Sequence, residues 1–428
     1  MPVSATVIGL MSGTSHDAID AAAAQIHLED GAAGPTLVLR PLGLVSAPYE
    51  PGLRRAITAA LPPNPTSMGA VCELDTRIGQ AFADLAARAD TELCDGRADL
   101  AVSHGQTLFH WVEGGQVRGT LQLGQAAWIA ERTGLTTVSD LRSRDVAAGG
   151  QGAPLVSLID VLWLHGLQAG EADGIAPAGS AAAVNLGGIA NATVLRPGAD
   201  PIAFDTGPAN ALLDAAVHDR TGGRQSADVD GLLALAGSTH PRLLEALLAD
   251  GFYERPAPKT TGKELFHPGY IAERARAADP PVDLDELSLE DLAATLTELT
   301  GRTLAGALTS ANTTGAPGLV VLSGGGTRNP AIVAAIRRHL PASNVRISDE
   351  LGFDSAAKEA LAFAALGFFT VHGLPGALPS CTGAGRAAVL GSITPGTRGA
   401  PPLSGSPFGA ANPSARVPAP IALRIEQP

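Results

Sequence analysis

The chain has 428 residues, a formal net charge of −13 and three cysteines. So negative a charge argues against a nucleic-acid-binding surface, and three scattered cysteines predict neither disulfides nor structural zinc. No run approaches about 18 uninterrupted apolar residues, so the sequence predicts no membrane span. The length predicts two or three domains, and MPVSATVIGL lacks the basic segment of a signal peptide, so we expect a cytoplasmic protein.

The first predicted element is a pair of strands over Val7–His27, joined by the small polar turn SGTS at residues 12–15. This turn offers backbone N–H groups and three hydroxyls, and Asp17 and Asp20 follow it closely. Such a turn can wrap a phosphate, while a nearby carboxylate can hold Mg²⁺ through water. The alternative is an ordinary hairpin turn, because Gly and Ser are common in turns of any kind.

A third strand is predicted over Thr36–Val45 and a helix over Ser67–Arg88, where apolar residues recur three or four apart. The short buried strand Asp99–Ser103 then leads to HGQT at residues 104–107. A polar cluster at the end of a buried strand is where α/β folds bind ligands. His104 can equally be a hydrogen-bonded structural histidine.

A second polar cluster follows the predicted strand Thr136–Ser139. It consists of DLRSRD at residues 140–145 and AAGGQGAP at 147–154, ahead of the apolar helix Leu155–Leu167. Two Arg and two Asp within six residues usually form a solvated surface loop. Here glycines, which allow the backbone to approach a ligand, follow them directly.

The order of the opening elements returns in the middle of the chain. The strand Ala181–Asn185 runs into LGGIAN, residues 186–191, and the strand Pro201–Phe204 leads to DTGPAN, residues 205–210, and a helix. The two regions are similar in the order of their strands, turns and helix, and not in sequence identity. Asp205 ends a strand before a Gly-Pro turn and a helix, so it is either an acid–base group or a residue that caps the turn or the helix.

The clearest predicted helix spans Ser288–Asn312. The strand Leu319–Leu322, the loop SGGGTRN and a helix from Pro330 follow. Three glycines between a strand and a helix can form a shelf for adenosine, because they admit a flat base where side chains would clash. Another helix is predicted over Ser355–Val371, and the Pro-, Ala-, Ser- and Gly-rich residues 396–428 are predicted to be a disordered tail.

Taken together, these motifs resemble those of the anhydro-N-acetylmuramic acid kinases, a family of the actin-like, sugar-kinase ATPase superfamily. The similar segments, in order, are GLMSGTSHDAID, SHGQTLFH, LQLGQAAWIAERTG, DLRSRDVAAGGQGAPLV, VNLGGIANAT, FDTGPANALLD, PKTTGKELF, LSGGGTRN and AAKEALAFAALG with LPSCTGA. The resemblance implies an α/β, two-domain actin-like ATPase fold, a duplicated ribonuclease H-like fold with the nucleotide in the interdomain cleft. Domain I would be residues 1–140 and 355–395, and domain II residues 141–354.

The resemblance also implies which residues form the site. Asp205 would be the general base, and Asp17 would hold Mg²⁺ through water. The residues implied for ATP are Gly13, Thr14, Ser15, His16, Asp17, Ala18, Ile19, Asp20, Gly188, Asn191, Gly324, Gly325 and Gly326. The residues implied for the sugar are His104, Gln106, Thr107, Arg142, Asp145 and Gln151.

The implied reaction consumes ATP, water and 1,6-anhydro-N-acetylmuramic acid and yields N-acetylmuramic acid 6-phosphate and ADP, in peptidoglycan recycling and amino-sugar catabolism. The implied partner is this small amino sugar, with a possible homodimer and neither nucleic acid nor membrane. Two alternatives stay open. Another sugar kinase of the same fold is one, although DLRSRD and SHGQT argue against it. A non-metabolic actin-like or chaperone-type ATPase is the other, although the chain has no spare region for a peptide-binding domain.

The sequence departs from the family pattern at His16, Ala18, Leu141, Ser157 and Ala209. Ala18 and Ala209 stand where glycine is usual, which matters only if the backbone there needs a positive φ. The chain lacks GxxxxGK[ST], so it is not a P-loop enzyme, and TGAGRAAV lacks the preceding strand of a dinucleotide-binding fold. The chain's three lysines, Lys259, Lys263 and Lys358, all lie inside the family-like motifs.

Overall fold

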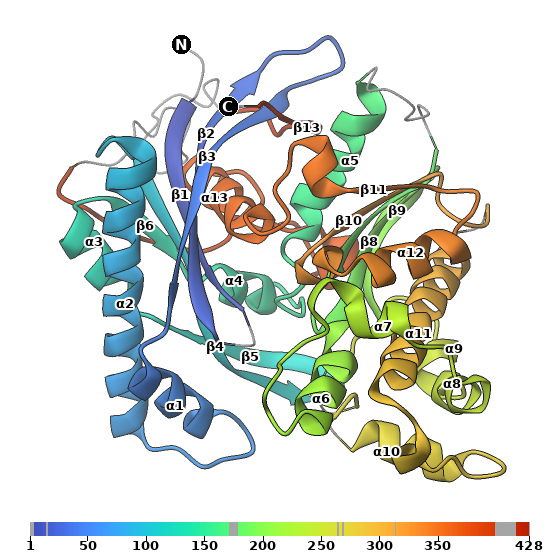
Figure 1. The fold of residues 1–428 in the computed structure, drawn as a ribbon. Helices are drawn as coiled ribbons and strands as arrows, with labels where there is room; N and C mark the ends of the chain where they lie inside the picture. The colour runs from blue at the N-terminus through green and yellow to red at the C-terminus, as the bar shows by residue number, and fades with distance from the viewer. Residues whose placement is uncertain are drawn as a thin grey trace. The chain divides into compact units, whose positions relative to one another are not determined.

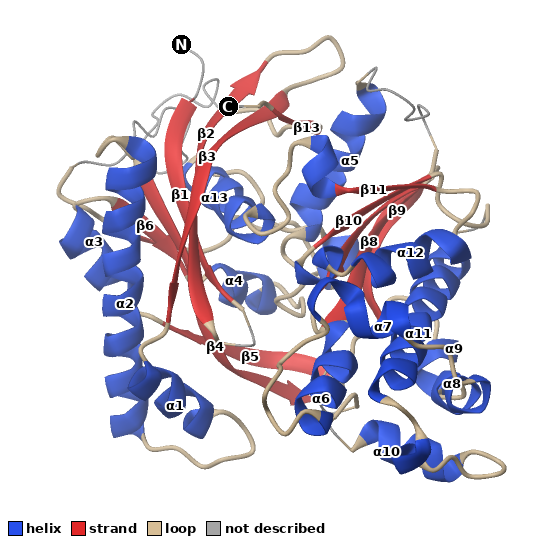
Figure 2. Ribbon diagram, in the orientation of Figure 1, coloured by secondary structure: helices blue, strands red, loops and turns tan. Residues whose placement is uncertain are grey.

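The computed structural model describes residues 4–13, 16–170, 179–262, 265–267, 269–312, 314–398 and 417–427. Contacts between Cα atoms divide the chain into two compact units. Unit 1 combines Met1–Gly166 with Ala357–Pro428, and unit 2 is Leu167–Ala356. Each unit is built on one mixed β-sheet (Figures 1 and 2).

The sheet of unit 1 is organised around β1 (Ser4–Ser12). This strand pairs antiparallel with β2 (Ala18–Glu29) and parallel with β4 (Leu100–Glu113). Further out, β3 (Thr36–Pro48) runs antiparallel to β2, and β6 (Thr136–Ser139) runs parallel to β4. The remaining strands of this sheet are β5 (Gln116–Leu123), β12 (Ser392–Thr394) and β13 (Ala422–Ile425).

Helices cover both faces of this sheet. The helices of this unit are α1 (Pro51–Ala60), α2 (Met68–Cys94), α3 (Ala126–Thr133), α4 (Leu141–Ala147), α5 (Ser157–Ala169), α13 (Lys358–Val371) and α14 (Pro379–Thr382), of which α2 and α13 pack on the central strands. On one face, Ile8 and Leu10 of β1 share a core cluster with Phe82 of α2. Gly9 points to the opposite face, because side chains alternate along a strand. A Cβ at Gly9 would lie 1.9 Å from the carbonyl oxygen of Ala360, so glycine is needed for the close approach of α13.

The sheet of unit 2 is organised around β7 (Ala181–Leu186). This strand pairs antiparallel with β8 (Ile189–Arg196) and parallel with β10 (Leu319–Ser323). Further out, β9 (Ala199–Pro208) runs antiparallel to β8, and β11 (Asn344–Ile347) runs parallel to β10. β7 and β10 are almost completely buried, which explains their continuous apolar character.

The two sheets therefore have the same topology. The order is β3-β2-β1-β4-β6 in unit 1 and β9-β8-β7-β10-β11 in unit 2. In each, three antiparallel strands are followed by two strands parallel to the first. This repeated order confirms the predicted α/β, duplicated ribonuclease H-like fold of the actin-like ATPases. The location of a nucleotide between the two domains stays a prediction.

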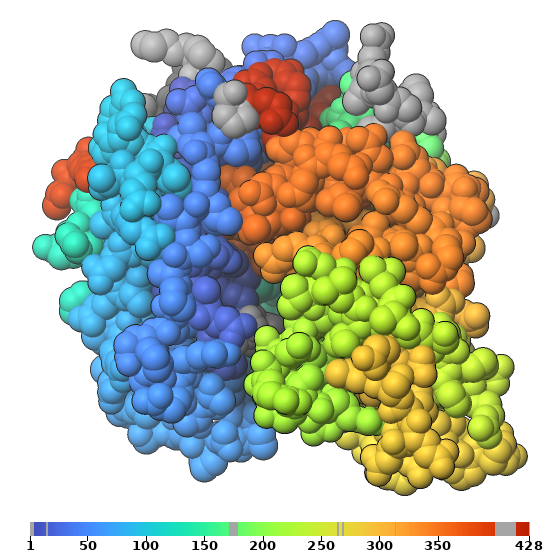
Figure 3. All heavy atoms as spheres, in the orientation of Figure 1, coloured from blue at the N-terminus to red at the C-terminus, as the bar shows by residue number. Residues whose placement is uncertain are grey.

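Unit 2 carries more helices than its sheet requires. They are α6 (Asn210–Arg220), α7 (Leu232–Ala236), α8 (Pro241–Leu248), α9 (Gly251–Glu254), α10 (Tyr270–Ala277), α11 (Leu289–Ala311) and α12 (Pro330–His339), with short 3₁₀ turns η1 (Val229–Gly231), η2 (Leu284–Glu286), η3 (Gly325–Arg328) and η4 (Ser348–Leu351). Figure 3 shows the segment from α6 to α10, green to yellow, at the surface of this unit. α8 packs on both α10 and α11, and the three helices share a core cluster that includes Leu243, Tyr270 and Leu296.

The unit boundaries differ from the expected domains, which were 1–140 with 355–395 and 141–354. Residues 141–166 belong to unit 1 because their polar side chains bond to it. Arg142 bonds to His104 of β4. Asp160 of α5 forms a buried ion pair of 2.7 Å with Lys358 of α13. Neither bond could be read from local sequence pattern.

The prediction that residues 396–428 form a disordered tail is wrong for the part that the structure describes, residues 396–398 and 417–427. β13 adds to the edge of the sheet by parallel pairing with β3, and Leu423 is fully buried there. Arg398 forms an ion pair of 2.8 Å with Asp90 at the end of α2. Residues 399–416 lie outside the described residues.

Candidate active site

Two polar contacts join the described residues on either side of the polar turn between β1 and β2. The His16 N–H donates to the Gly13 carbonyl at 3.1 Å, and the Ser12 hydroxyl lies 2.9 Å from the Ala18 carbonyl oxygen. His16 has φ 43°, whereas Ala18 is not among the residues with a positive φ. The missing family glycine at position 18 therefore imposes no backbone strain. Thr14 and Ser15, also expected to bind ATP, lie outside the described residues.

Gln106, for which contact with the sugar stays a prediction, lies beneath this turn. Its side chain is buried, and its Oε1 lies 2.8 Å from the Ser12 hydroxyl and accepts from the Tyr49 hydroxyl at 3.2 Å. Its Nε2 donates to the Gly13 carbonyl at 3.3 Å. Both ends of the amide are thus bonded to the hairpin and its surroundings, and Gln106 supports the polar turn from the neighbouring strand β4.

Two carboxylates stand at the start of β2. Asp17 is exposed and pairs with Arg54 of α1, and Asp20 accepts a hydrogen bond from Ser46 of β3. Among the described residues, no cluster of three His, Cys, Asp or Glu side chains could enclose a metal ion. Mg²⁺ usually keeps several waters and needs only one or two carboxylates beside the substrate phosphates. The residues present therefore fit Mg²⁺ held through water, not a closed protein cage.

The Arg of DLRSRD is held by a buried histidine. His104 Nδ1 donates to the Gly105 carbonyl at 2.8 Å, so its Nε2 is an acceptor and receives Arg142 Nε–H at 2.8 Å. Burial, followed by the charge of Arg142, holds the pKa of His104 well below its usual range, which keeps the ring neutral. Arg142 Nη1 donates to the Gly152 carbonyl at 2.6 Å. Within the described ranges Nη2 has no bond, so one edge of the guanidinium can receive an anion.

Asp145 and Gln151 are predicted to bind the sugar. In the structure both form hydrogen bonds that hold the glycine loop after α4 in place. Asp145 is buried and accepts from the Gly152 N–H and the Thr382 hydroxyl, each at 2.8 Å. The Gln151 N–H donates to the Thr382 carbonyl at 2.8 Å, and its Oε1 accepts from the Val117 N–H at 3.0 Å. Both side chains therefore fix the loop whose Gly152 carbonyl holds Arg142.

Thr107 leads to a residue that the sequence reasoning missed. Its hydroxyl accepts from Gln122 Nε2 at 3.2 Å, and Thr120 accepts from the same group at 2.7 Å. Gln122 Oε1 is buried without a partner in the described part of the chain. Reversing the amide would only exchange which of its two ends is unpaired. The available signal was the antiparallel register, which places Gln122 directly opposite Thr107.

In unit 2, Asp205 lies near the end of β9, opposite Asn191 of β8. Its Oδ2 accepts from the Thr261 N–H at 2.8 Å, and its own N–H donates to the Lys259 carbonyl at 2.8 Å. The following helix, α6, has Ala209 at its N-cap position and no side-chain cap. The two bonds join Asp205 to the segment 259–261, and both interpretations, an acid–base group or a cap of the turn or the helix, stay predictions.

The turn of unit 2 after β7 meets the N-terminus of α6. The Gly188 carbonyl accepts from the N–H groups of Ala209 and Ala211 at 2.9 and 3.0 Å. Ala209 has φ −109°, so this position does not adopt the positive φ that would favour glycine. Asn210 Nδ2 donates to the carbonyls of Leu186 and Gly187, which fixes the strand end on the helix.

The three glycines expected to bind adenosine have different roles. A Cβ at Gly324 would lie 2.3 Å from Asn185 Oδ1, and one at Gly326 would lie 2.7 Å from Leu186 Cβ. These two are thus needed for packing on the end of β7. Gly325 is exposed, and a Cβ there would meet only the Arg328 side chain, at 3.5 Å. A cavity of about 490 Å³ beside this loop is lined by Thr327, Pro330, Val333, Ala334, Arg337, Arg338 and Ile347.

Two sheets of one topology, with small polar turns after their first strands, define this protein as a member of the actin-like, sugar-kinase ATPase class. Within that class, the chain belongs to the anhydro-N-acetylmuramic acid kinase family, whose model matches residues 5–396. A relative from Rhodococcus erythropolis with that name is 55% identical over 427 residues, or 98% of this chain and 99% of the relative. One from Streptomyces avermitilis is 58% identical over 393 residues, or 92% of this chain and 95% of the relative.

In the described ranges, none of the helices has the length and apolarity needed to cross a membrane.

Proposed function

We propose that this chain is an ATP-dependent kinase that hydrolytically opens 1,6-anhydro-N-acetylmuramic acid and phosphorylates it to N-acetylmuramic acid 6-phosphate. The observation that carries the proposal is the match to this family over nearly the whole chain, with relatives of that name at 55% and 58% identity. The reaction would serve the recycling of peptidoglycan in the cytoplasm.

Recognition of the sugar is assigned to the side chains held around Arg142. The lactyl group of this sugar carries a carboxylate, and a guanidinium is the side chain best suited to hold one. Arg142 is fixed at Nε by His104 and at Nη1 by Gly152, which leaves Nη2 for the substrate. Thr107 of β4 and Gln122 of β5 add hydroxyl and amide groups from a pair of residues inside these two strands.

Asp205 is assigned as the general base. It would accept a proton from the water whose oxygen attacks the anomeric carbon, while the bond between that carbon and the bridging oxygen breaks. The released oxygen at position 6 takes the γ-phosphoryl group as its bond to ADP breaks. The water oxygen thus becomes the anomeric hydroxyl, and one proton is released overall. Positioning and charge neutralisation are what the protein supplies to phosphoryl transfer.

The nucleotide is assigned to residues 13–20 for its phosphates and to the loop at Gly325 for adenosine. Gly188 and Asn191 are assigned to the same nucleotide from the turn of unit 2. Asp17 would hold Mg²⁺ through water, and that ion would neutralise charge on the phosphates. Support comes from the exposed Asp17 carboxylate and from the cavity beside Thr327.

The test is ADP formation by the purified protein with three additions: the anhydro sugar, N-acetylmuramic acid, or no sugar. We expect ADP only with the anhydro sugar, together with a product heavier by one water and one phosphate group. Equal rates with N-acetylmuramic acid would favour another sugar kinase, since that sugar needs no ring opening. ADP formation independent of sugar would favour an actin-like or chaperone-type ATPase.

A further inference from the structure

Lys259 lies in the segment that contacts Asp205, and its ammonium group is buried. The residue is 5% exposed. Its Nζ donates to the carbonyls of Phe252 and Tyr253 at 2.9 and 3.1 Å and lies 4.5 Å from the centre of the Phe252 ring. Among the described residues, no carboxylate pairs with it. A buried cation bound only to carbonyls and a ring is unusual, because buried charges normally have a charged partner.

The two carbonyls belong to the last turn of α9, whose other end is capped by Asp250. Carbonyls at a helix C-terminus lack partners within the helix and attract cations. Lys259 therefore folds back on residues only six and seven positions earlier and closes the segment 252–259 into a loop.

The backbone of the same segment reaches the proposed base. The Lys259 carbonyl accepts from the Asp205 N–H, and the Thr261 N–H donates to Asp205 Oδ2, both at 2.8 Å. The loop is thus anchored at one end by the ammonium group and at the other by two bonds to one residue of β9. Movement of the loop would release the carboxylate oxygen.

We propose that Lys259 is a positioning residue: its ammonium group closes residues 252–259 into a fixed loop, and this loop holds the adjoining Thr261 N–H on Asp205 Oδ2. This inference rests on the proposed role of Asp205. The carboxylate then keeps one orientation toward the attacking water. The hydrogen bond also favours its ionised form, which is the form that can accept a proton.

The decisive variant is Lys259→Met, which keeps the stem on the Phe252 ring and removes the three donors. We expect kcat to fall about 10²-fold, as misplacement of a reacting group typically does. The KM values for sugar and ATP should change little. The acidic limb of the pH profile should move to higher pH, because the Asp205 carboxylate loses a bond to its charged form. A purely structural lysine would lower stability without moving that limb.

Two comparisons complete the experiment. Thr260→Ala changes the exposed neighbour in the same segment and should leave kcat and the profile unchanged. In an Asp205→Asn background, Lys259→Met should cause no further loss of kcat, because residues that act as a unit are not additive. Losses that multiply in the double variant would overturn the inference, as would Lys259→Met with the parental kcat and profile.

Lys259→Leu, which also removes the three donors, takes the place of Lys259→Met if that variant does not fold. If neither folds while Thr260→Ala does, Lys259 is a residue of core stability and the inference fails. An active Asp205→Asn variant would instead overturn the proposed mechanism. An inactive Asp205→Asn variant with a fully active Lys259→Met would overturn this inference alone.

Discussion

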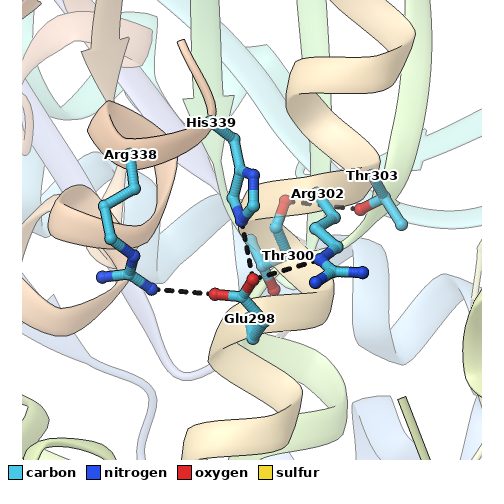
Figure 4. Close-up of polar contacts among 6 residues, drawn as sticks. All are labelled: Glu298, Thr300, Arg302, Thr303, Arg338 and His339. Carbon is cyan, nitrogen blue, oxygen red and sulfur yellow. Dashed lines mark hydrogen bonds and ion pairs between the residues drawn. The ribbon is translucent and has the colours of Figure 1, made fainter. Parts of the chain in front are cut away.

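Glu298 of α11 and His339 at the end of α12 are joined by a hydrogen bond of 2.7 Å between Oε1 and Nε2. Figure 4 shows the same carboxylate held by Arg302 from its own helix and by Arg338, at 3.1 and 2.8 Å. The Glu298 side chain is only 11% exposed. One carboxylate thus connects two helices of unit 2.

Removal of this charge should destabilise the protein. Burial favours neutral Glu298, but hydrogen bonds from His339, Arg338 and Arg302 outweigh it, so its pKa is lowered. Its contribution is therefore present at neutral pH and lost as the pH falls below the ordinary glutamate range. We expect Glu298→Gln to lower the free energy of unfolding by about 1–3 kcal/mol at pH 7. This is less than the cost of breaking a fully buried ion pair, because the partners of Glu298 are partly exposed. The difference from the parent, measured by urea unfolding, should shrink toward pH 4. A difference in unfolding free energy that stays the same from pH 7 to pH 4 would contradict this prediction.

Two glycines of α11 should respond oppositely to alanine. A Cβ at Gly301 would lie 2.9 Å from the Ala335 Cβ on α12, whereas one at Gly306 would have no neighbour within 4 Å. Gly301→Ala should thus cost about 1–3 kcal/mol through overpacking. Gly306→Ala should stabilise by about 0.5–1 kcal/mol, because glycine loses more backbone freedom in a helix. Thermal unfolding measures both, and equal shifts would refute the close packing of α11 on α12.

Arg142→Ala should affect the sugar and not the nucleotide. Removing one partner of a desolvated charge pair typically costs about 2–5 kcal/mol. We expect a higher KM for the sugar or a lower kcat, with the KM for ATP little changed. Arg144→Ala is the matched control, because Arg144 is exposed two positions further along the same helix. A selective loss of ATP affinity would place Arg142 on the phosphates instead.

His104 should act only as a neutral acceptor. Its lowered pKa means that the unfolded chain binds a proton here more readily than the native protein. This residue's contribution to stability should therefore be lost as the pH falls below its ordinary pKa of about 6.5. His104→Phe removes the acceptor of Arg142 Nε–H and should raise the sugar KM. His104→Gln, which can still accept, should retain more affinity. Steady-state kinetics measure the sugar KM of both variants. Equal sugar KM values for His104→Phe and His104→Gln would show that the hydrogen bond accepted from Arg142 is unimportant for sugar binding.

Asp205→Asn tests the general base. Asn keeps the shape and can accept the Thr261 N–H, but it cannot take a proton from water. General-base loss typically lowers kcat about 10²–10⁴-fold. Ring opening and ADP formation should fall together, while sugar and ATP still bind. With the parent enzyme, isotopically labelled water should place its oxygen at the anomeric position and never in the phosphate. Label in the phosphate would rule out the mechanism.

Much of this protein was determined by local sequence. The periodicity of residues 67–88 predicted α2, and small residues between apolar runs predicted the turns after β1 and β7. These features depend on neighbours a few positions apart, so they are visible in pattern alone. Family membership could also be recognised from the sequence, because it depends on short motifs that follow one another in a fixed order.

Tertiary structure alone decided which polar groups meet. Ser12 and Gln106 are 94 positions apart, and Thr261 meets Asp205 across 56 positions. β13 joins the sheet beside β3 although its composition resembled a tail. Such contacts depend on strand register and helix packing, which sum many weak interactions over the whole chain. A local pattern therefore identifies the candidate residues, while the fold decides which of them can contact a substrate and which support their neighbours.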